Sequence, residues 1–217
     1  MLVVVIPAYR ESATIAKVVT GVSSSAPVIV VDDNSGDATG DLASEAGAEV
    51  VRNVYNLGYE GALNVGFEAA AARGATSILT MDADGEHGPE YVESFRRLLI
   101  DDNVPLVLGI RPRRPRLAEV IVGSYVHMRF GLSDIFCGMK GYQTYLWRQH
   151  GCFDSRRAVG TELALAAIRG GVGFRQVLVS GRSRTGEPRF DTRFSANLRI
   201  AQAVARGLSA PVLRPAE

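Results

Sequence analysis

The chain has 217 residues, of which 47% are hydrophobic and 22% are charged, and its formal net charge is +1. This composition is typical of a globular protein with a buried core, and it excludes a chain that is disordered throughout. No apolar stretch approaches the roughly 18 residues that a membrane-spanning helix needs. Two cysteines without a CxxC spacing exclude a disulfide framework and fit a reducing, cytoplasmic compartment.

Short apolar strands alternate with helices along the first half of the sequence. Strands are predicted at residues 2–6, 28–31, 49–52, 77–81 and 106–109, and helices at residues 11–22, 37–46, 58–73 and 89–100. Because the strands are apolar throughout, both of their faces are expected to be covered by helices. The pattern therefore predicts the α/β class, with a mostly parallel sheet and helices on both faces.

The pattern is looser after residue 110, where a basic loop with two prolines covers residues 111–116. The later elements are predicted to be helices at 117–130, 161–169 and 190–208 and strands at 138–142 and 174–179. The last helix is amphipathic, with arginines opposite its apolar face. It either lies on an anionic membrane surface or packs against the domain or a second subunit. No linker composition interrupts the chain, so a single domain over residues 1–217 is expected.

Charge is distributed unevenly between the two halves. Residues 1–104 contain 6 basic and 16 acidic residues, a formal charge of −10, whereas residues 105–217 contain 18 basic and 7 acidic residues, a charge of +11. An acidic half suits a metal cation, and an arginine-rich half suits phosphate groups, a nucleic acid or an anionic membrane. The alternative is a bias towards arginine on solvated surfaces.

Acidic residues gather where the predicted strands end, which is the edge of a parallel sheet that binds ligands. Asp82 and Asp84 stand one residue apart after the fourth strand, and Glu86 follows. Two such carboxylates can hold one Mg²⁺ or Mn²⁺ ion together with substrate phosphates; turn-forming aspartates beside Gly85 are the alternative. No GxGxxG follows the first two strands and GxxxxGK[ST] is absent, which argues against a dinucleotide-binding fold and excludes a P-loop protein.

Four segments resemble, in order, the signatures of glycosyltransferase family 2. They are residues 4–11 (VVIPAYRE), 30–39 (VVDDNSGDAT), 56–66 (NLGYEGALNVG) and 80–87 (TMDADGEH). Residues 133–140 (SDIFCGMK) and 182–187 (RSRTGE) are similar to the subgroup of dolichyl- and polyprenyl-phosphate sugar synthases. The resemblance implies a Rossmann-like GT-A fold, in which residues 1–110 bind a nucleotide-sugar and residues 111–217 form the acceptor side.

The resemblance also implies roles for particular residues. The residues expected to bind the nucleotide-sugar are Pro7, Tyr9, Glu11, Asp33, Asp82, Ala83, Asp84, Glu86 and Arg111. Asp82 and Asp84 are expected to hold Mg²⁺ or Mn²⁺, and Asp84 and Arg111 are expected to take part in catalysis. Arg10 and Glu86 stand where the family usually has Asn and Gln, which leaves the nucleotide base and the sugar open.

The nature of the acceptor decides whether the reaction needs a general base. A polyprenyl phosphate, the acceptor expected from the resemblance, is already anionic and needs only arginines to position it. The candidates for this role are Arg113, Arg114, Arg182 and Arg184. A sugar hydroxyl requires a carboxylate base, for which Glu162 is the best candidate. The alternative for Glu162 is an acid that the helix dipole favours in the first turn of a helix.

The predicted function is a metal-dependent, inverting transfer of a hexose from a nucleoside-diphosphate sugar to a polyprenyl (dolichyl) phosphate. The enzyme is expected to be cytoplasmic and in peripheral contact with the inner face of a membrane. Transfer to a sugar hydroxyl of a polysaccharide or glycolipid is the alternative within the family. A metal-dependent nucleotidyltransferase usually has a basic Gly-rich loop after the first strand, which is missing here. A non-catalytic module that binds polyanions or membranes leaves the acidic edge unexplained, and nucleic acid is not expected as a partner.

Overall fold

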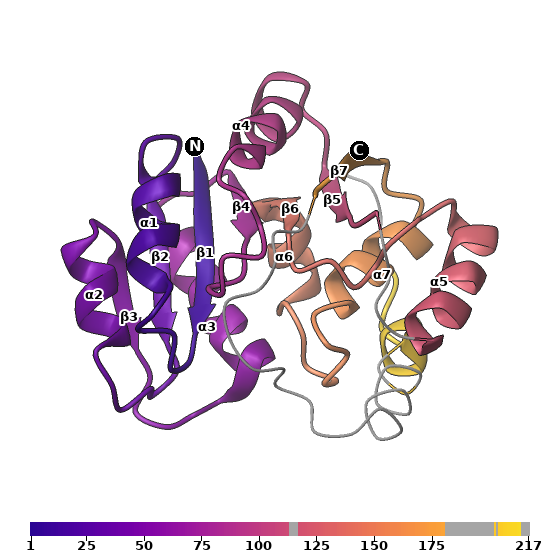
Figure 1. Cartoon of the computed structure of the whole chain (residues 1–217). Coiled ribbons are helices and arrows are strands. Elements are labelled where there is room, and N and C mark those ends of the chain that lie inside the picture. The colour runs from indigo at the N-terminus through magenta and orange to yellow at the C-terminus, as the bar shows by residue number, and fades with distance from the viewer. Residues whose placement is uncertain (113–116, 181–201, 203, 214–217) are drawn as a thin grey trace.

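The computed structural model describes residues 1–112, 117–180, 202 and 204–213 (Figure 1). In this part of the chain, the strands form one sheet in the order β3-β2-β1-β4-β6-β5-β7. Their bounds are β1 (Leu2–Ala8), β2 (Val28–Asp32), β3 (Glu49–Arg52), β4 (Ser77–Thr80), β5 (Leu106–Ile110), β6 (Lys140–Gln143) and β7 (Phe174–Leu178). β6 is antiparallel to both β4 and β5, and the other pairs are parallel. The predicted mostly parallel α/β sheet is confirmed.

Helices pack on both faces of this sheet, as predicted. Their bounds are α1 (Ile15–Ser23), α2 (Thr39–Glu45), α3 (Gly58–Ala72), α4 (Tyr91–Arg96) with a π-helical turn at Arg97–Asp101, α5 (Leu117–Phe130), α6 (Thr144–His150) and α7 (Glu162–Arg169). Along β1, Val3 and Val5 join one hydrophobic cluster, and Val4 and Ile6 join the other. Successive side chains of a strand point to opposite faces, so β1 is apolar throughout because both of its faces are buried.

Two parts of the predicted C-terminal half need comment. Helix α6 was not predicted, since its seven residues complete less than two turns and show no clear helical periodicity. It ends at Gly151, whose φ of 89° is the left-handed conformation that glycine adopts easily. The predicted helix at 190–208 lies outside the described residues up to residue 201; residues 202 and 204–208 are helical.

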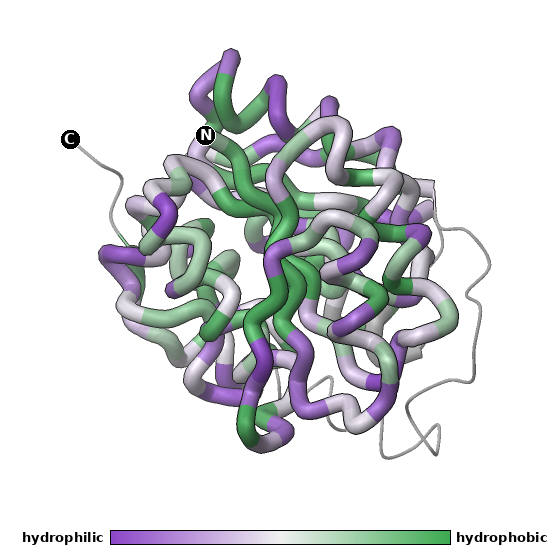
Figure 2. The backbone as a smooth tube through the Cα atoms, turned by 90° about the vertical axis from the view of Figure 1, so that its left-hand side faces the viewer, coloured by the Kyte–Doolittle hydropathy of each residue, from purple (hydrophilic) through white to green (hydrophobic). Residues whose placement is uncertain are grey.

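Aromatic packing joins the two halves of the molecule. The ring of Phe67 on α3 lies 4.9 Å from that of Phe153 and 5.8 Å from that of Tyr142 on β6. Gly66 faces the sheet, where an added Cβ would overlap the Val5 side chain. α3 therefore lies close against β1, and the loop after Phe153 is anchored beside it. Figure 2 shows the hydrophobic strands running through the middle of the molecule, with hydrophilic segments around them.

The topology brings four chain segments to one edge of the sheet. β1 and β2 are parallel and end together, with Ala8 opposite Asp32. β4 is parallel to β1 and ends at Thr80, so the turn that begins at Asp82 lies at the same edge. Because β6 runs the other way, its first residue, Lys140, pairs with Thr80 and also lies at this edge. The polar residues around positions 9, 33, 82 and 140 consequently surround one region.

Candidate active site

A small pocket lies between the ends of β1 and β2 and the start of α3. It has a volume of about 250 Å³. Its lining residues are Pro7, Ala8, Tyr9, Asp33, Asn56, Gly58, Tyr59 and Ala62. The structure thus brings together Pro7, Tyr9 and Asp33, three of the residues expected to bind a nucleotide-sugar. Asn56 and Tyr59 belong to the third signature segment but were not singled out as site residues.

Asp33 shapes this pocket through hydrogen bonds to the chain before α3. Its carboxylate is buried and accepts the backbone N–H groups of Leu57 and Gly58, each at 2.8 Å, and the side-chain amide of Asn53 at 2.7 Å. Oδ1 receives two of these bonds and Oδ2 receives one. A carboxylate oxygen can accept two, so Oδ2 retains one acceptor position for a ligand.

Arg10 adopts a backbone conformation that explains why this position suits Asn. Its φ is 57°, in the left-handed region that Asn adopts more readily than Arg. The backbone N–H of Arg10 donates to Ser35 Oγ at 3.0 Å, and its guanidinium lies 5.2 Å from the centre of the Tyr9 ring. Glu11 is turned towards α1, where its Oε2 accepts a hydrogen bond from Thr14 at 3.1 Å. Glu11 is not among the residues that line the small pocket.

A larger cleft, of about 990 Å³, adjoins the small pocket. The two share Asn56, Gly58 and Tyr59 in their linings. Five segments contribute charged or polar side chains to the large cleft: the start of α3, the turn after β4, the start of β6, the loop before α7 and the helical turn near the C-terminus. The ionisable residues that line it are Tyr59, Glu60, Asp82, Lys140, Asp154, Arg157 and Arg206.

The two predicted metal ligands, Asp82 and Asp84, lie on the turn after β4. Asp82 lines the large cleft, with its Oδ1 3.5 Å from the Tyr59 hydroxyl. Asp84 is 8% exposed, accepts the Glu86 backbone N–H at 3.0 Å and lines a separate cleft of about 720 Å³ beside α1. Ala83 between them is buried. In this conformation the two carboxylates face different clefts, although they are one residue apart.

The surroundings of Asp82 fit a hard divalent cation. Carboxylate oxygens are the ligands that Mg²⁺ and Mn²⁺ prefer. His87 is buried beside them, with Nδ1 3.6 Å from Asp82 Oδ2 and Nε2 3.6 Å from Cys137 Sγ. Among the described residues, Nδ1 of His87 has no hydrogen-bond partner, so a water molecule bound to such an ion could serve as its partner. Burial lowers the pKa of His87, but the Cys137 hydrogen bond and the Asp82 charge outweigh burial and raise it to about 9.

Arg111, expected near a phosphate, forms an ion pair with Asp134. Its Nε donates to Asp134 Oδ2 at 2.8 Å and its Nη2 to Oδ1 at 3.2 Å, and the Arg111 side chain is 15% exposed. Burial raises the pKa of Asp134, but the Arg111 hydrogen bonds and charge outweigh this effect and lower it. The predicted acceptor-binding residues Arg113, Arg114, Arg182 and Arg184 lie outside the described residues.

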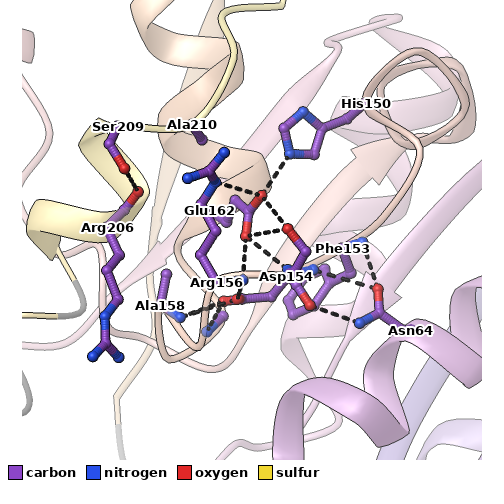
Figure 3. A network of polar contacts seen from close by, with 12 residues as sticks. Asn64, His150, Phe153, Asp154, Arg156, Ala158, Glu162, Arg206, Ser209 and Ala210 are labelled. Atoms are coloured by element: carbon purple, nitrogen blue, oxygen red, sulfur yellow. Dashed lines mark hydrogen bonds and ion pairs between the residues drawn. The ribbon is translucent and has the colours of Figure 1, made fainter.

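Glu162, the predicted base, begins α7 and is 1% exposed (Figure 3). Its carboxylate accepts the backbone N–H groups of Ser155 at 2.7 Å and Arg156 at 2.9 Å, and His150 Nε2 lies 3.1 Å away. Burial raises the pKa of Glu162, but these hydrogen bonds outweigh burial and leave the pKa below its ordinary value. Glu162 is not among the residues that line the three clefts described here. Its role as a base stays a prediction.

A comparison with protein families covers the four signature segments. Residues 3–158 match the model of Glycosyl transferase family 2. The chain belongs to glycosyltransferase family 2. The family expected from the four signature segments is therefore confirmed.

Curated relatives of this glycosyltransferase are similar over part of their length. The polyprenol monophosphomannose synthase of Mycolicibacterium smegmatis is 30% identical over 163 residues, with 64% of this chain and 60% of the relative covered. The UDP-N-acetylglucosamine–dolichyl-phosphate N-acetylglucosaminyltransferase of Methanococcus voltae is 28% identical over 161 residues, with 65% and 64% covered. The chain spans less than two thirds of the length of either relative.

Solved structures show the same fold. Glucosyl-3-phosphoglycerate synthase from Mycobacterium tuberculosis, in complex with Mn²⁺, uridine diphosphate and glucosyl-3-phosphoglycerate, superposes with a TM-score of 0.76 at 22% identity. The superposition covers 96% of this chain and 79% of the synthase. The expected GT-A fold is confirmed. In the part of this glycosyltransferase that the structure describes, no helix combines the length and apolar character needed to cross a bilayer.

Lys140 and Asp154 are among the residues of the large cleft that were missed as individual site candidates. Lys140 is 2% exposed and donates from Nζ to the carbonyl of Gly160 at 2.8 Å, and burial lowers its pKa. Asp154 is 3% exposed, and burial raises its pKa to about 6. Lys140 lay within a segment that resembles the family, and it is the only lysine after residue 17. Its place beside Asp82, however, depends on the antiparallel pairing of β6 with β4.

Proposed function

We propose that this chain carries the catalytic site of a metal-dependent glycosyltransferase that moves a hexose from a nucleoside-diphosphate sugar to a polyprenyl phosphate. The observation that carries the proposal is the continuity of the two hollows. The small pocket at Pro7, Tyr9 and Asp33 opens through shared lining residues into the large cleft, where Asp82 lies. A nucleoside fits the small pocket, and its diphosphate and sugar then extend past Asp82 into the large cleft.

Each part of the donor meets side chains suited to it. Tyr9 offers an aromatic face for a base, and the free acceptor position of Asp33 Oδ2 suits an N–H or O–H group of a nucleoside. Asp82 and Asp84 would hold a Mg²⁺ or Mn²⁺ ion once the Asp84 carboxylate turns towards the cleft of Asp82, and the ion would stabilise the negative charge of the departing diphosphate. Lys140 lines the same cleft, where its Nζ donates to the carbonyl of Gly160.

A phosphate acceptor agrees with the state of Glu162. A phosphate oxygen is already a nucleophile and needs no proton removed, whereas a hydroxyl does. Glu162 is buried and saturated with hydrogen bonds, including two from backbone N–H groups. Direct attack by the phosphate on the face of the sugar opposite the diphosphate inverts the anomeric configuration. The hydroxyl-acceptor alternative, with Glu162 as base, stays a prediction that a variant can test.

An apolar stripe on α5 supports a lipid-linked acceptor. Ile121, Tyr125 and Met128 are 63%, 49% and 84% exposed, and their spacing of four and three residues places them on one helix face. A helix face of this kind favours contact with the interface of a bilayer. Both curated relatives are named for a lipid: polyprenol in one name and dolichyl phosphate in the other. We infer that the enzyme works in peripheral contact with the membrane that holds its acceptor.

The decisive experiment is a transfer assay with farnesyl phosphate as a short acceptor. A panel of nucleoside-diphosphate hexoses is supplied with Mn²⁺, with Mg²⁺ or with EDTA, and the anomeric configuration of the lipid-linked product is determined by NMR. We expect product with at least one donor, loss of product in EDTA and inversion at the anomeric carbon. Asp82→Asn and Asp84→Asn should each reduce turnover by about a hundredfold or more, whereas Glu45→Gln on the exposed surface of α2 should not.

Contrary results are equally clear. Full turnover in EDTA, or in both aspartate variants, would remove the metal role. Transfer to a neutral saccharide but never to farnesyl phosphate would replace the phosphate acceptor by a hydroxyl. Membership of the family argues against a nucleotidyltransferase and against a non-catalytic module; nucleotide transfer in the absence of sugar transfer would overturn that conclusion.

A further inference from the structure

Two arginines line the large cleft together with Asp82 and have no assigned role. Arg157 belongs to the loop between Phe153 and α7, and Arg206 belongs to the helical turn near the C-terminus. Both are exposed. Among the described residues, neither guanidinium makes an ion pair or a side-chain hydrogen bond. Such arginines, on the wall of a cleft, are available to a ligand.

The two segments that carry these arginines pack against each other. Gly207 follows Arg206, and a Cβ built on it would lie 3.7 Å from the Cβ of Ala158 and 3.1 Å from Thr161 Oγ1. Ala158, in turn, follows Arg157. The segments are therefore in contact at the residues directly after the two arginines. Figure 3 shows the Arg206 side chain extending from the helical turn on the side of the loop that holds Ala158.

The loop that carries Arg157 is held rigidly by buried carboxylates. Asp154 accepts the backbone N–H groups of Arg156, Ala158 and Gly160 at 3.1, 3.0 and 2.9 Å. Glu162 accepts the N–H of Ser155 and shares that of Arg156 with Asp154. From α3, Glu60 Oε1 accepts the N–H of Val159 at 3.2 Å. Few backbone donors of the loop remain free, so Arg157 projects from a fixed backbone.

The same loop holds backbone strain. Arg157 has a φ of 55° and Val159 a φ of 51°. A β-branched residue such as valine is a genuine outlier in this left-handed region. Strained conformations persist where the surroundings over-determine them, and they cluster at ligand-binding sites. The carboxylate bonds to this loop supply that over-determination, and the result is a fixed direction for Arg157.

We propose that Arg157 and Arg206 bind the phosphate group of the acceptor. Among the other charged groups of the cleft, Asp154 and Glu60 are bonded to the loop backbone, and Lys140 donates to Gly160. The two guanidinium groups are left to bind an anion, and a planar guanidinium matches the oxygens of a phosphate in a bidentate manner. A phosphate bound there shares one cleft with Asp82 and the donor sugar. The transfer step rests on the proposed function, whereas the binding of phosphate does not.

Calorimetric titration tests this site with three probes: farnesyl phosphate, 3-phosphoglycerate and farnesol. Each is titrated into protein that is saturated with UDP and Mn²⁺. We expect Arg157→Ala and Arg206→Ala each to weaken farnesyl phosphate binding about tenfold, and the double variant about a hundredfold. Lysine at both positions should restore part of the affinity. Farnesol binding should not change, and UDP should bind the double variant as it binds the wild type.

The matched control removes the same charge elsewhere. Arg148 on α6 and Arg175 on β7 are not among the residues that line the cleft, so Arg148→Ala/Arg175→Ala should bind farnesyl phosphate normally. If the cleft variants bind both farnesyl phosphate and 3-phosphoglycerate more weakly, the site accepts phosphate groups in general. If they bind only farnesyl phosphate more weakly, the site is specific for a lipid phosphate. Unchanged binding in the double variant, equal loss in the control, or no binding of either phosphate probe to the wild type would overturn the proposal. Failure of UDP and Mn²⁺ to bind the wild type would count against the proposed function instead.

Discussion

The Asp33 carboxylate accepts the backbone N–H of Gly58 at 2.8 Å and thereby ties the end of β2 to the first residue of α3. The N–H of Leu57 donates to the same carboxylate. Both donors belong to the start of a helix, where N–H groups have no partner within the helix. Asp33, which is expected to bind the nucleotide, therefore also holds one wall of the small pocket in place.

Replacing Asp33 should consequently reduce both stability and donor binding. Asp33→Ala removes the acceptor of the partly buried Leu57 and Gly58 N–H groups, which we expect to cost about 1–3 kcal/mol in the free energy of unfolding. Urea denaturation measures this cost, and calorimetry with UDP measures the loss of affinity. Asp41→Asn on the exposed surface of α2 is the control. An Asp33→Ala protein with unchanged stability would show that these hydrogen bonds contribute little.

Gly138 offers a way to disturb Asp82 without removing its charge. A Cβ on residue 138 would overlap the Asp82 carboxylate. We expect Gly138→Ala to displace that carboxylate and lower turnover by about tenfold or more, with a smaller effect on UDP affinity. At Gly173 the same change meets no atom within 4 Å, so Gly173→Ala should behave as wild type. Equal kinetics for the two variants would argue that the position of Asp82 is unimportant.

Glu162→Gln decides between the two kinds of acceptor. If the acceptor is a phosphate, the variant should keep its turnover number with farnesyl phosphate, although the loss of two charge-assisted acceptors should lower stability by about 1–3 kcal/mol. Single-turnover kinetics at a temperature well below the unfolding midpoint separate the two effects. A loss of more than about a hundredfold in the chemical step, with UDP binding intact, would identify Glu162 as a base.

Stability should fall in acid because of Glu162 and Asp134. The pKa of each carboxyl is lowered in the folded state, mainly by hydrogen bonds that outweigh burial. The folded protein therefore binds these protons less tightly than the unfolded chain does. Their contribution is present above about pH 4–5 and is lost as the pH falls through the folded-state values. Urea unfolding between pH 3 and pH 7 should show a weaker pH dependence for Glu162→Gln/Asp134→Asn than for wild type; identical slopes would contradict the assignment.

The apolar face of α5 should govern binding to membranes. Ile121→Ser/Met128→Ser is expected to reduce co-sedimentation with anionic vesicles several-fold, since each change removes apolar surface that enters the interface. Transfer to farnesyl phosphate in detergent should be unaffected. Val54→Ser, at an equally exposed valine outside α5, is the control. Undiminished vesicle binding by the α5 variant would place the membrane contact elsewhere.

The family and the sheet edge could be predicted because their signals are local. Runs such as Val3–Ile6 are apolar at every position, which only a strand buried on both faces requires, and the acidic residues stand directly after such runs. Parallel strands place these ends at one edge whatever the details of packing. Pro7, Tyr9, Asp33 and Asp82 could therefore be assigned to a common region without coordinates.

The chain alone established a glycosyltransferase sheet with an acidic edge, since hydrophobic periodicity and signature segments depend on neighbours in sequence. Tertiary structure decided the rest. Lys140 lies at the same sheet edge as Asp82 only because β6 runs antiparallel to β4. Glu162 is saturated only because the loop at Ser155 folds back over it. Arg157 and Arg206 line one cleft because the segments that carry them meet at Ala158 and Gly207. Each of these contacts joins segments whose meeting is set by packing of the whole core, which no local pattern encodes.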